Sequence, residues 1–508
     1  MSPVLSKSKL LAYRQCAKRL WLEVHHPELR ADSAATEAAF NTGHAVGEMA
    51  RRLYDPKSQG RLVDLKLEGV TQAIARTKDL LKTRAPVFEA GFAAQGARAF
   101  ADILLPVGGA RGGKWRMVEV KSSADVLDYQ EDDAAIQHFT ATRSGLKLDS
   151  IAVANVETSW TYPGNGDYTG LLTETDVTQN AIERAPEVRQ WIAAAQAVAR
   201  KRKAPAIHTG KHCNEPFPCG FEEHCVSQEE PVEHPVRWLP GSRQRALKKH
   251  LQLPGVWSMA DVPDDLLNAS QLRVKQVTLS NQVHFDKAGA AAELRAHKLP
   301  ALFLDFEAIA HVVPVWKGTR PYMAIPFQFS LHRLARNGAL DHREFLDLSG
   351  NDPSAAIAEA LVRAAGTRGP IFVYSPYERT TILGLAGRLP KFRRALEALA
   401  GRFVDLLPVV KKHYYHPSQH GSWGLKAVLP AVLPPTVRGL SYSHLEEVSG
   451  GIAAQLAYQE AIAPETTAAR KQQLRQHLTA YCKLDTLALV HVWRVLSGRT
   501  GLKIPQRG

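Results

Sequence analysis

Three of the five cysteines, Cys213, Cys219 and Cys225, fall in one short segment with the spacing Cys-x5-Cys-x5-Cys. Two prolines and a glycine inside this segment disfavour a regular helix. An irregular loop can turn several thiolates toward one centre, but three cysteines leave a tetrahedral site one ligand short. Cys16 is the obvious fourth ligand. A shared centre therefore requires a fold that brings the start of the chain next to this loop.

The residue types alone leave the occupant of such a centre open. Zinc accepts mixed cysteine and histidine sites, and His212 and His224 adjoin the cysteines. Iron–sulfur clusters also take four thiolates, so both remain candidates. Three unrelated cysteines are the alternative, which such dense clustering disfavours. The fifth cysteine, Cys482, lies in a helical pattern and is expected to be a packed thiol.

The chain has 508 residues and a formal charge of +14, which suits a polyanionic partner such as nucleic acid. A transmembrane stretch of about 18 apolar residues is absent from the sequence, and so are the features of a signal peptide. Five cysteines in so long a chain do not make a secreted disulfide framework. We therefore expect a cytoplasmic protein without a membrane partner; the sequence indicates no particular protein partner.

Three parts are expected along the chain. Residues 1–230 show mixed helix and strand patterns, and the segment SQEEPVEHPVRWLPG marks a boundary. Residues 231–297 are expected to form a mostly helical connector. From residue 298 a second pattern follows, with the strand-like runs LFLDFEAI, AIPFQFSLH and REFLDLS, then alternating strands and helices and a long last helix. This order predicts a mixed sheet covered by helices, and the fold class is α/β.

The first acidic motif lies in the strand-like runs AFADILLP and KWRMVEVKSS. Alternate residues of a strand share a face, so Glu119 and Lys121 are expected to point together. Asp102 lies on the preceding strand, and a helix carrying Gln137 follows. A metal ion held by Asp102 and Glu119 would polarise a phosphoryl oxygen, and Lys121 would offset charge that develops there. The alternative is a Glu/Lys pair on a solvated strand face.

The second acidic motif lies in LFLDFEAI, where Asp305 and Glu307 share a face of an otherwise apolar strand. Burying two carboxylates is costly unless something, such as a metal ion, neutralises them. Asp485 interrupts the apolar stripe of the last helix, and Tyr481 lies one turn before it. The functional interpretation is a metal ligand and a tyrosine that orients water. The alternative is an aspartate bonded to a polar group of the core.

The first motif resembles the PD-(D/E)XK motif of RecB-like nucleases, carried by Asp102, by Glu119-Val120-Lys121 and by Gln137. The cysteine plan resembles that of the iron–sulfur members of that superfamily. The resemblance covers about residues 1–230 and implies a restriction-endonuclease-like domain whose four cysteines bind a [4Fe–4S] cluster. Glu89, before the Asp102 strand, is a candidate extra metal ligand. The usual Gln-x3-Tyr pattern is not met, since Ala141 stands at the tyrosine position.

The second motif resembles the DEDD exonucleases of the RNase H-like fold, over about residues 298–498. Asp305 and Glu307 match the first Asp-x-Glu motif, and Tyr481 with Asp485 matches the last Tyr-x3-Asp motif. Glu378 is the best positional match for the middle aspartate, and Asp405 is a further candidate. Such carboxylates hold two divalent ions, Mg²⁺ or Mn²⁺, for phosphodiester hydrolysis.

Together the two halves resemble a bacterial family that fuses a RecB-like nuclease to an RNase H-like domain. The expected function is metal-dependent cleavage of DNA, exonucleolytic, in repair or defence. Two alternatives stay open: an RNA-directed exonuclease that uses the second centre alone, and a nucleic-acid-binding module in which both centres have decayed.

Overall fold

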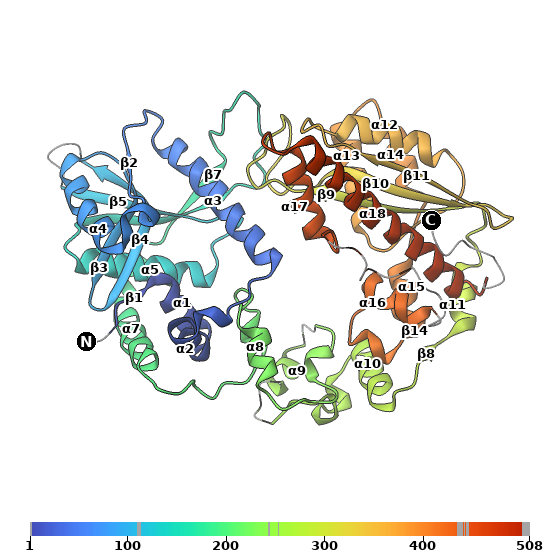
Figure 1. The fold of residues 1–508 in the computed structure, drawn as a ribbon, viewed down its shortest axis with the longest axis horizontal. Helices are drawn as coiled ribbons and strands as arrows, with labels where there is room; N and C mark the ends of the chain where they lie inside the picture. Colours follow the sequence, from blue (N-terminus) through green and yellow to red (C-terminus); the bar gives the residue numbers. More distant parts are fainter. Residues whose placement is uncertain are drawn as a thin grey trace. The chain divides into compact units, whose positions relative to one another are not determined.

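A computed structural model describes the chain except for a few short stretches (Figure 1). It divides the mixed α/β chain into two compact units. Unit 1 comprises Met1–Glu230 with His311–Met323, and unit 2 comprises Pro231–Ala310 with Ala324–Gly508. Among the described residues, no helix is both long and apolar enough to cross a membrane. The described residues are 3–108, 113–241, 244–251, 253, 255–433, 440, 442, 445 and 447–499.

The described part of unit 1 contains a seven-stranded mixed sheet with the order β2-β3-β4-β5-β6-β7, and β1 pairs with β4. Strand β4 is antiparallel to both β3 and β5, whereas β6 is parallel to β5. The strands are β1 (Leu5–Ser6), β2 (Arg61–Leu62), β3 (Val87–Ala94), β4 (Ala97–Val107), β5 (Lys114–Val120), β6 (Leu148–Val156) and β7 (Leu172–Asp176).

Helices cover the sheet of unit 1 because its strands carry apolar side chains on both faces. Trp115 and Met117 of β5 belong to one hydrophobic cluster with Phe139 of α5. Val118 of β5 belongs to another cluster, with Ala50 of α3. This alternation agrees with the faces expected from the sequence. The helices are α1 (Lys7–Gln15), α2 (Ala17–His25), α3 (Ala34–Tyr54), α4 (Leu65–Leu80), α5 (Asp128–Arg143), α6 (Thr178–Glu183), α7 (Ala185–Ala199) and α8 (Glu222–Ser227).

The main sheet of unit 2 has the strand order β11-β10-β9-β12-β13. Strands β9, β10 and β11 form an antiparallel meander, and β12 and β13 run parallel to β9. The central position of β9 explains why this strand is apolar along almost its whole length. The strands are β9 (Ala301–Ile309), β10 (Ile325–Leu334), β11 (Leu340–Leu346), β12 (Ile371–Val373) and β13 (Phe403–Asp405).

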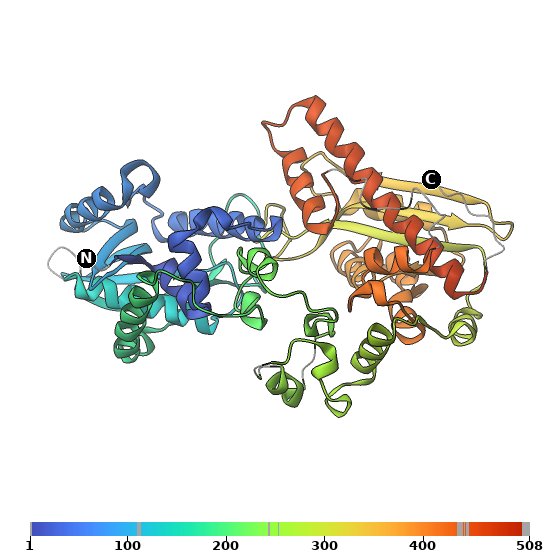
Figure 2. The ribbon, with the colours of Figure 1, turned by 60° about the horizontal axis from the view of Figure 1, so that its bottom comes forward.

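Helices cover both faces of this second sheet. Leu302, Leu304 and Phe306 of β9 pack in one cluster with α12 (Ser354–Ala365), α13 (Tyr377–Arg388) and α14 (Arg393–Ala400). On the opposite face, Phe303 lies edge-on to Trp493 of α18 (Ala468–Leu496), with ring centroids 5.6 Å apart. Figure 2 shows α18 crossing the sheet. The alternation of residues along β9 therefore directs Asp305 and Glu307 toward the α18 side.

The stretch expected to be a connector, 231–297, is part of unit 2. Its strand β8 (His284–Phe285) pairs with β14 (Tyr414–Tyr415), and its helices α9 (Arg245–His250), α10 (Ala269–Ser280) and α11 (Lys287–Leu294) are short. Ala290 and Leu294 of α11 are buried in the same cluster as Val409 of α15 (Leu406–His413). Side chains of this stretch thus complete the core of unit 2.

Candidate functional sites

Three carboxylates converge beside the sheet of unit 2. Asp305 and Glu307 extend from β9, and Asp485 extends from the middle of α18. One carboxylate oxygen of each lies within 4.8 Å of those of the other two. Within the described ranges, this is the only set of three or more acidic, histidine or cysteine side chains with that spacing. Carboxylate oxygens are hard ligands that suit Mg²⁺ or Mn²⁺, so the donor set fits such an ion.

Burial and mutual repulsion make this acidic group costly in the absence of a cation. Glu307 is 6% exposed and Asp485 7% exposed. Burial, followed by repulsion from Asp485, raises the pKa of Glu307 to about 8 and that of Asp305 well above its ordinary range. Burial also raises the pKa of Asp485. A bound cation would offset both effects, because it compensates desolvated negative charge.

A fourth acidic side chain, Glu378, joins this centre from the first turn of α13. Its buried carboxyl group shares a hydrogen bond with Asp305 and accepts a hydrogen bond of 2.9 Å from Ser375 Oγ. Burial raises the pKa of Glu378 to about 7. Asp405, the other candidate, is instead the N-cap of α15, where its Oδ1 accepts a hydrogen bond of 2.9 Å from Leu407 N. The geometry therefore favours Glu378 over Asp405 as the fourth acidic group.

Two tyrosines and a lysine border the same carboxylates. Tyr442 and Tyr481 both donate hydrogen bonds from their hydroxyls to Asp485. Burial and the neighbouring carboxylates raise the pKa of both tyrosines far above the ordinary range, so their hydroxyls stay protonated donors. Lys426 of α16 (Leu425–Val432) places its Nζ 5.1 Å from the ring centroid of Tyr481 and 5.3 Å from that of Tyr442. Its charge offsets part of the rise in the pKa of Glu307.

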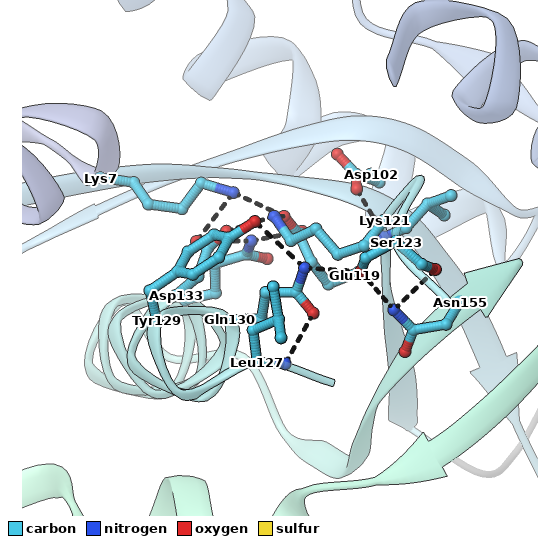
Figure 3. Close-up of polar contacts among 12 residues, drawn as sticks. Lys7, Asp102, Glu119, Lys121, Ser123, Leu127, Tyr129, Gln130, Asp133 and Asn155 are labelled. Atoms are coloured by element: carbon cyan, nitrogen blue, oxygen red, sulfur yellow. Dashed lines mark hydrogen bonds and ion pairs between the residues drawn. The ribbon is translucent and has the colours of Figure 1, made fainter. Parts of the chain in front are cut away.

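The first acidic centre is arranged differently, as a network of ion pairs (Figure 3). Lys121 Nζ lies 2.6 Å from Glu119 Oε1 and also pairs with Asp133 of α5. Lys7 Nζ, from the first residue of α1, lies 2.8 Å from Glu119 Oε1 and 3.0 Å from Asp133 Oδ1. Gln137 Nε2 donates to the other oxygen of Glu119. The sequence-predicted residues Glu119, Lys121 and Gln137 therefore meet, together with two residues that were not predicted.

Asp102 and Glu89 lie near this network, but each has a different partner. Asp102 Oδ2 accepts a hydrogen bond of 2.7 Å from the backbone N–H of Val120, and burial raises its pKa. Glu89 has a φ of +56° in β3 and lies 4.0 Å from Arg51. Burial and then repulsion from Glu119 raise the pKa of Glu89. The carboxylates of Glu89, Asp102 and Glu119 do not form a group within 4.8 Å in the described structure, because each is turned toward its own partner.

The four predicted cysteine ligands line one pocket of unit 1. Cys16 lies at the break between α1 and α2, in an extended conformation that ends one helix and starts the next. Burial raises the pKa of Cys213 to about 11 and also raises the pKa of Cys219 and Cys225. Among the described residues, no three of these sulfur atoms lie within 4.8 Å of one another.

Hydrogen bonds from Gln15, the residue before Cys16, connect the start of the chain to the cysteine loop. Gln15 Nε2 donates to the carbonyl oxygen of His212 at 2.7 Å and to that of Phe217 at 2.8 Å. Both carbonyls belong to the loop that carries three of the cysteines. The start of the chain is thus fixed against residues 213–225, as a shared centre requires.

Sequence reasoning missed four residues of the two acidic centres: Lys7, Asp133, Lys426 and Tyr442. Asp133 lies one helical turn before Gln137, so the face of α5 already indicated it. Lys7 is distant in sequence from Glu119. It reaches Glu119 because the strand before it, β1, pairs with β4. Tyr442 and Lys426 lie outside the motifs that drew attention to this region.

Comparison with known proteins adds one match. A family model described as a domain of unknown function (DUF2779) matches residues 302–424. The matched segment includes Asp305, Glu307 and Glu378 but ends before Asp485. The search of curated proteins finds no match to the chain.

Proposed function

We propose that this chain is a metal-dependent nuclease that hydrolyses DNA phosphodiester bonds, acting exonucleolytically in repair or defence. The observation that carries the proposal is the convergence of Asp305, Glu307 and Asp485, three carboxylates with oxygens within 4.8 Å in a buried site. The raised pKa values of Glu307 and Asp305 support the binding of a cation at this position. The net charge of +14 supports a polyanionic substrate.

Each residue of the second centre has a role in this proposal. Asp305, Glu307 and Asp485 would hold Mg²⁺ or Mn²⁺, with Glu378 as the fourth acidic group. When bound, such ions supply Lewis acidity and a hydroxide nucleophile for phosphodiester hydrolysis. The hydroxyls of Tyr481 and Tyr442 fix the orientation of Asp485 by donating to it. Lys426 brings positive charge to the edge of the site, where a phosphate of the substrate would need it.

The two units carry two proposed nuclease domains. The five-stranded mixed sheet and α18 support an RNase H-like, DEDD-type domain in unit 2. The mixed sheet of unit 1, with Glu119 on β5 and Lys121 directly after this strand, supports a restriction-endonuclease-like domain of the RecB type. In unit 1, Gln137 Oε1 is a buried acceptor without a hydrogen-bond partner among the described residues. A cation or a bound water there would satisfy it.

We also propose that Cys16, Cys213, Cys219 and Cys225 hold a [4Fe–4S] cluster. With a Zn–S distance of about 2.3 Å, a tetrahedral zinc site places its sulfurs about 3.8 Å apart. The four cysteines line one pocket, in which no three of the described sulfur atoms lie within 4.8 Å of one another. Burial raises the pKa of Cys213, so a thiolate there would need a positively charged group beside it.

The alternative of a single active centre in unit 2 also has an observation in its favour. Both oxygens of Glu119 are engaged by side chains of unit 1, whereas the acidic group of unit 2 has no such ion pairs among the described residues. The two proposals predict different DNA cleavage after the centre of unit 2 is inactivated. Anaerobic assays on end-labelled DNA and RNA, with Mg²⁺ or Mn²⁺, should show DNA cleavage that survives in part after Asp305→Asn. Complete loss, or cleavage of RNA alone, would favour the single-centre alternative.

A further inference from the structure

Lys7 is held at the first centre by the fold of its own segment. β1 pairs with β4, and Leu5 N donates a hydrogen bond of 2.9 Å to Gly96 O. Ser6 then caps α1 by accepting from Lys9 N. Leu10 of α1 is fully buried, and Arg14 lies 3.1 Å from Asp132 of α5. The backbone of Lys7 is therefore fixed at both ends, and its ammonium group reaches Glu119 from a defined position.

At the first centre, two lysines already neutralise Glu119 and Asp133 without a metal ion. Lys7 and Lys121 together face Glu119 and Asp133, two ammonium groups against two carboxylates whose side chains are 2% exposed. Burial opposes the charged form of Lys7, yet the attraction of Asp133 and Glu119 raises its pKa. A divalent cation at Glu119 would bring the same positive charge that Lys7 and Lys121 already supply. The lysines and the cation therefore compete for one carboxylate.

We propose that Lys7 is a positioning residue of the first centre that occupies the place of a divalent cation at Glu119, so that a metal ion binds there only as Lys7 withdraws. The inference rests on the proposed metal-dependent function of this centre. Gln137 is a second observation, because its Nε2 donates to Glu119 while its buried Oε1 has no hydrogen-bond partner among the described residues. A cation at Glu119 would give that oxygen a partner.

The same reasoning orders the two centres by metal affinity. In unit 2 none of the described ion pairs involves Asp305, Glu307 or Asp485, and the nearby cation, Lys426, lies over two tyrosine rings instead. A divalent cation therefore has no ion-paired lysine to displace at that centre, among the described residues. We infer that the centre of unit 2 fills first and that the centre of unit 1 fills only at higher concentrations of the metal ion.

The test measures Mn²⁺ binding to the full-length protein by electron paramagnetic resonance. Asp305→Asn and Asp485→Asn remove the centre of unit 2, and Lys7→Met is then compared with Lys9→Met. Lys9 lies on the same helix, and its side chain takes part in none of the ion pairs of the described residues. Lys7→Met should tighten Mn²⁺ binding about tenfold or more, whereas Lys9→Met should leave it unchanged. Equal or weaker binding by Lys7→Met, or no Mn²⁺ binding at all, would overturn the inference.

A second measurement uses the wild-type protein, so it does not depend on how the variant folds. Amine acetylation followed by mass spectrometry reports whether Lys7 is engaged. Saturating Mn²⁺ should increase the labelling of Lys7 several-fold and leave Lys9 unchanged. Unchanged labelling of Lys7 would contradict the inference. Neither readout requires cleavage, so a protein that passes both tests but cuts no DNA would refute the proposed function and leave the role of Lys7 standing.

Discussion

Asp485 of α18 and Glu307 of β9 hold carboxylate oxygens within 4.8 Å of each other, although one lies on a strand and the other on the last helix. Two buried carboxylates this close repel each other, which is why the pKa of Glu307 rises to about 8. Most of the other buried residues of α18 are apolar, and its buried polar residues include Thr486 and His491. Under the proposed function, both carboxylates would serve as metal ligands.

Folding stability should depend on pH through Glu307. The carboxyl has an ordinary pKa of 4.5 when unfolded and about 8 when folded. Between these values the folded protein binds more protons than the unfolded chain, so the free energy of unfolding falls as pH rises from 5 to 8. We expect Glu307→Gln to flatten this dependence in EDTA, measured by urea denaturation. Glu397→Gln, at an exposed position of α14, is the control. Parallel pH profiles for wild type and Glu307→Gln would contradict the assignment.

Metal binding should be visible in the melting temperature through Asp485. Wild-type protein should melt at a higher temperature with Mg²⁺ or Mn²⁺, because a ligand that binds only the folded state stabilises it. Asp485→Asn should lose most of this rise, whereas Asp265→Asn, at an exposed position, should keep it. Scanning fluorimetry across a metal titration is the measurement. If wild type shows no rise and Asp485→Asn is simply more stable, Asp485 is a core aspartate without a metal role.

Lys121 should contribute to cleavage at the first centre. In a background with Asp305→Asn and Asp485→Asn, Lys121→Ala should reduce the DNA cleavage rate by roughly a hundred- to a thousand-fold, the usual cost of removing one group that stabilises developing charge. Lys147→Ala, an exposed lysine of the same unit, should be neutral. Single-turnover cleavage of labelled DNA measures both. Equal rates for Lys121→Ala and its background would mean that this centre is inactive.

The cysteine centre should be structural. Linking Cys16 to the loop with Cys213 closes a long loop, and such cross-links stabilise a fold by roughly 2–5 kcal/mol in the disulfide analogy. Cys213→Ser should lower the soluble yield and remove iron and the absorbance near 400 nm from anaerobically purified protein. Cys482→Ser, in the core of unit 2, should retain the iron. A colourless preparation that contains zinc would show that the centre is not an iron–sulfur cluster.

The faces of individual elements were predictable because they follow from periodicity. The strand-like period of two placed Glu119 of β5 together with Lys121, which follows the strand. The helical period of α18 placed Asp485 among its buried residues. Cys482 was expected to be a packed thiol, and it is fully buried. Each of these predictions concerns one element, and local pattern is enough for it.

Relations between elements distant in sequence were not predictable in the same way. Lys7 reaches Glu119 only because β1 pairs with β4, and no local pattern encodes that pairing. The expected metal group of Asp102 and Glu119 with Glu89 depends on side-chain orientation, which Lys7, Arg51 and the Val120 N–H each influence. Sequence reasoning identified the residues at this centre but not their partners.

The most direct test of the account is cleavage of end-labelled DNA under anaerobic conditions with Mg²⁺ or Mn²⁺ by four proteins: wild type, Asp305→Asn, Asp485→Asn and the double variant. If Asp305 and Asp485 serve one shared metal centre, the two single variants and the double variant should lose similar activity rather than multiply their losses. Any remaining cleavage should disappear when Lys121→Ala is added. Metal-dependent cleavage that is undiminished in the double variant, or wild-type protein that cuts no DNA with either ion, would contradict the proposed function.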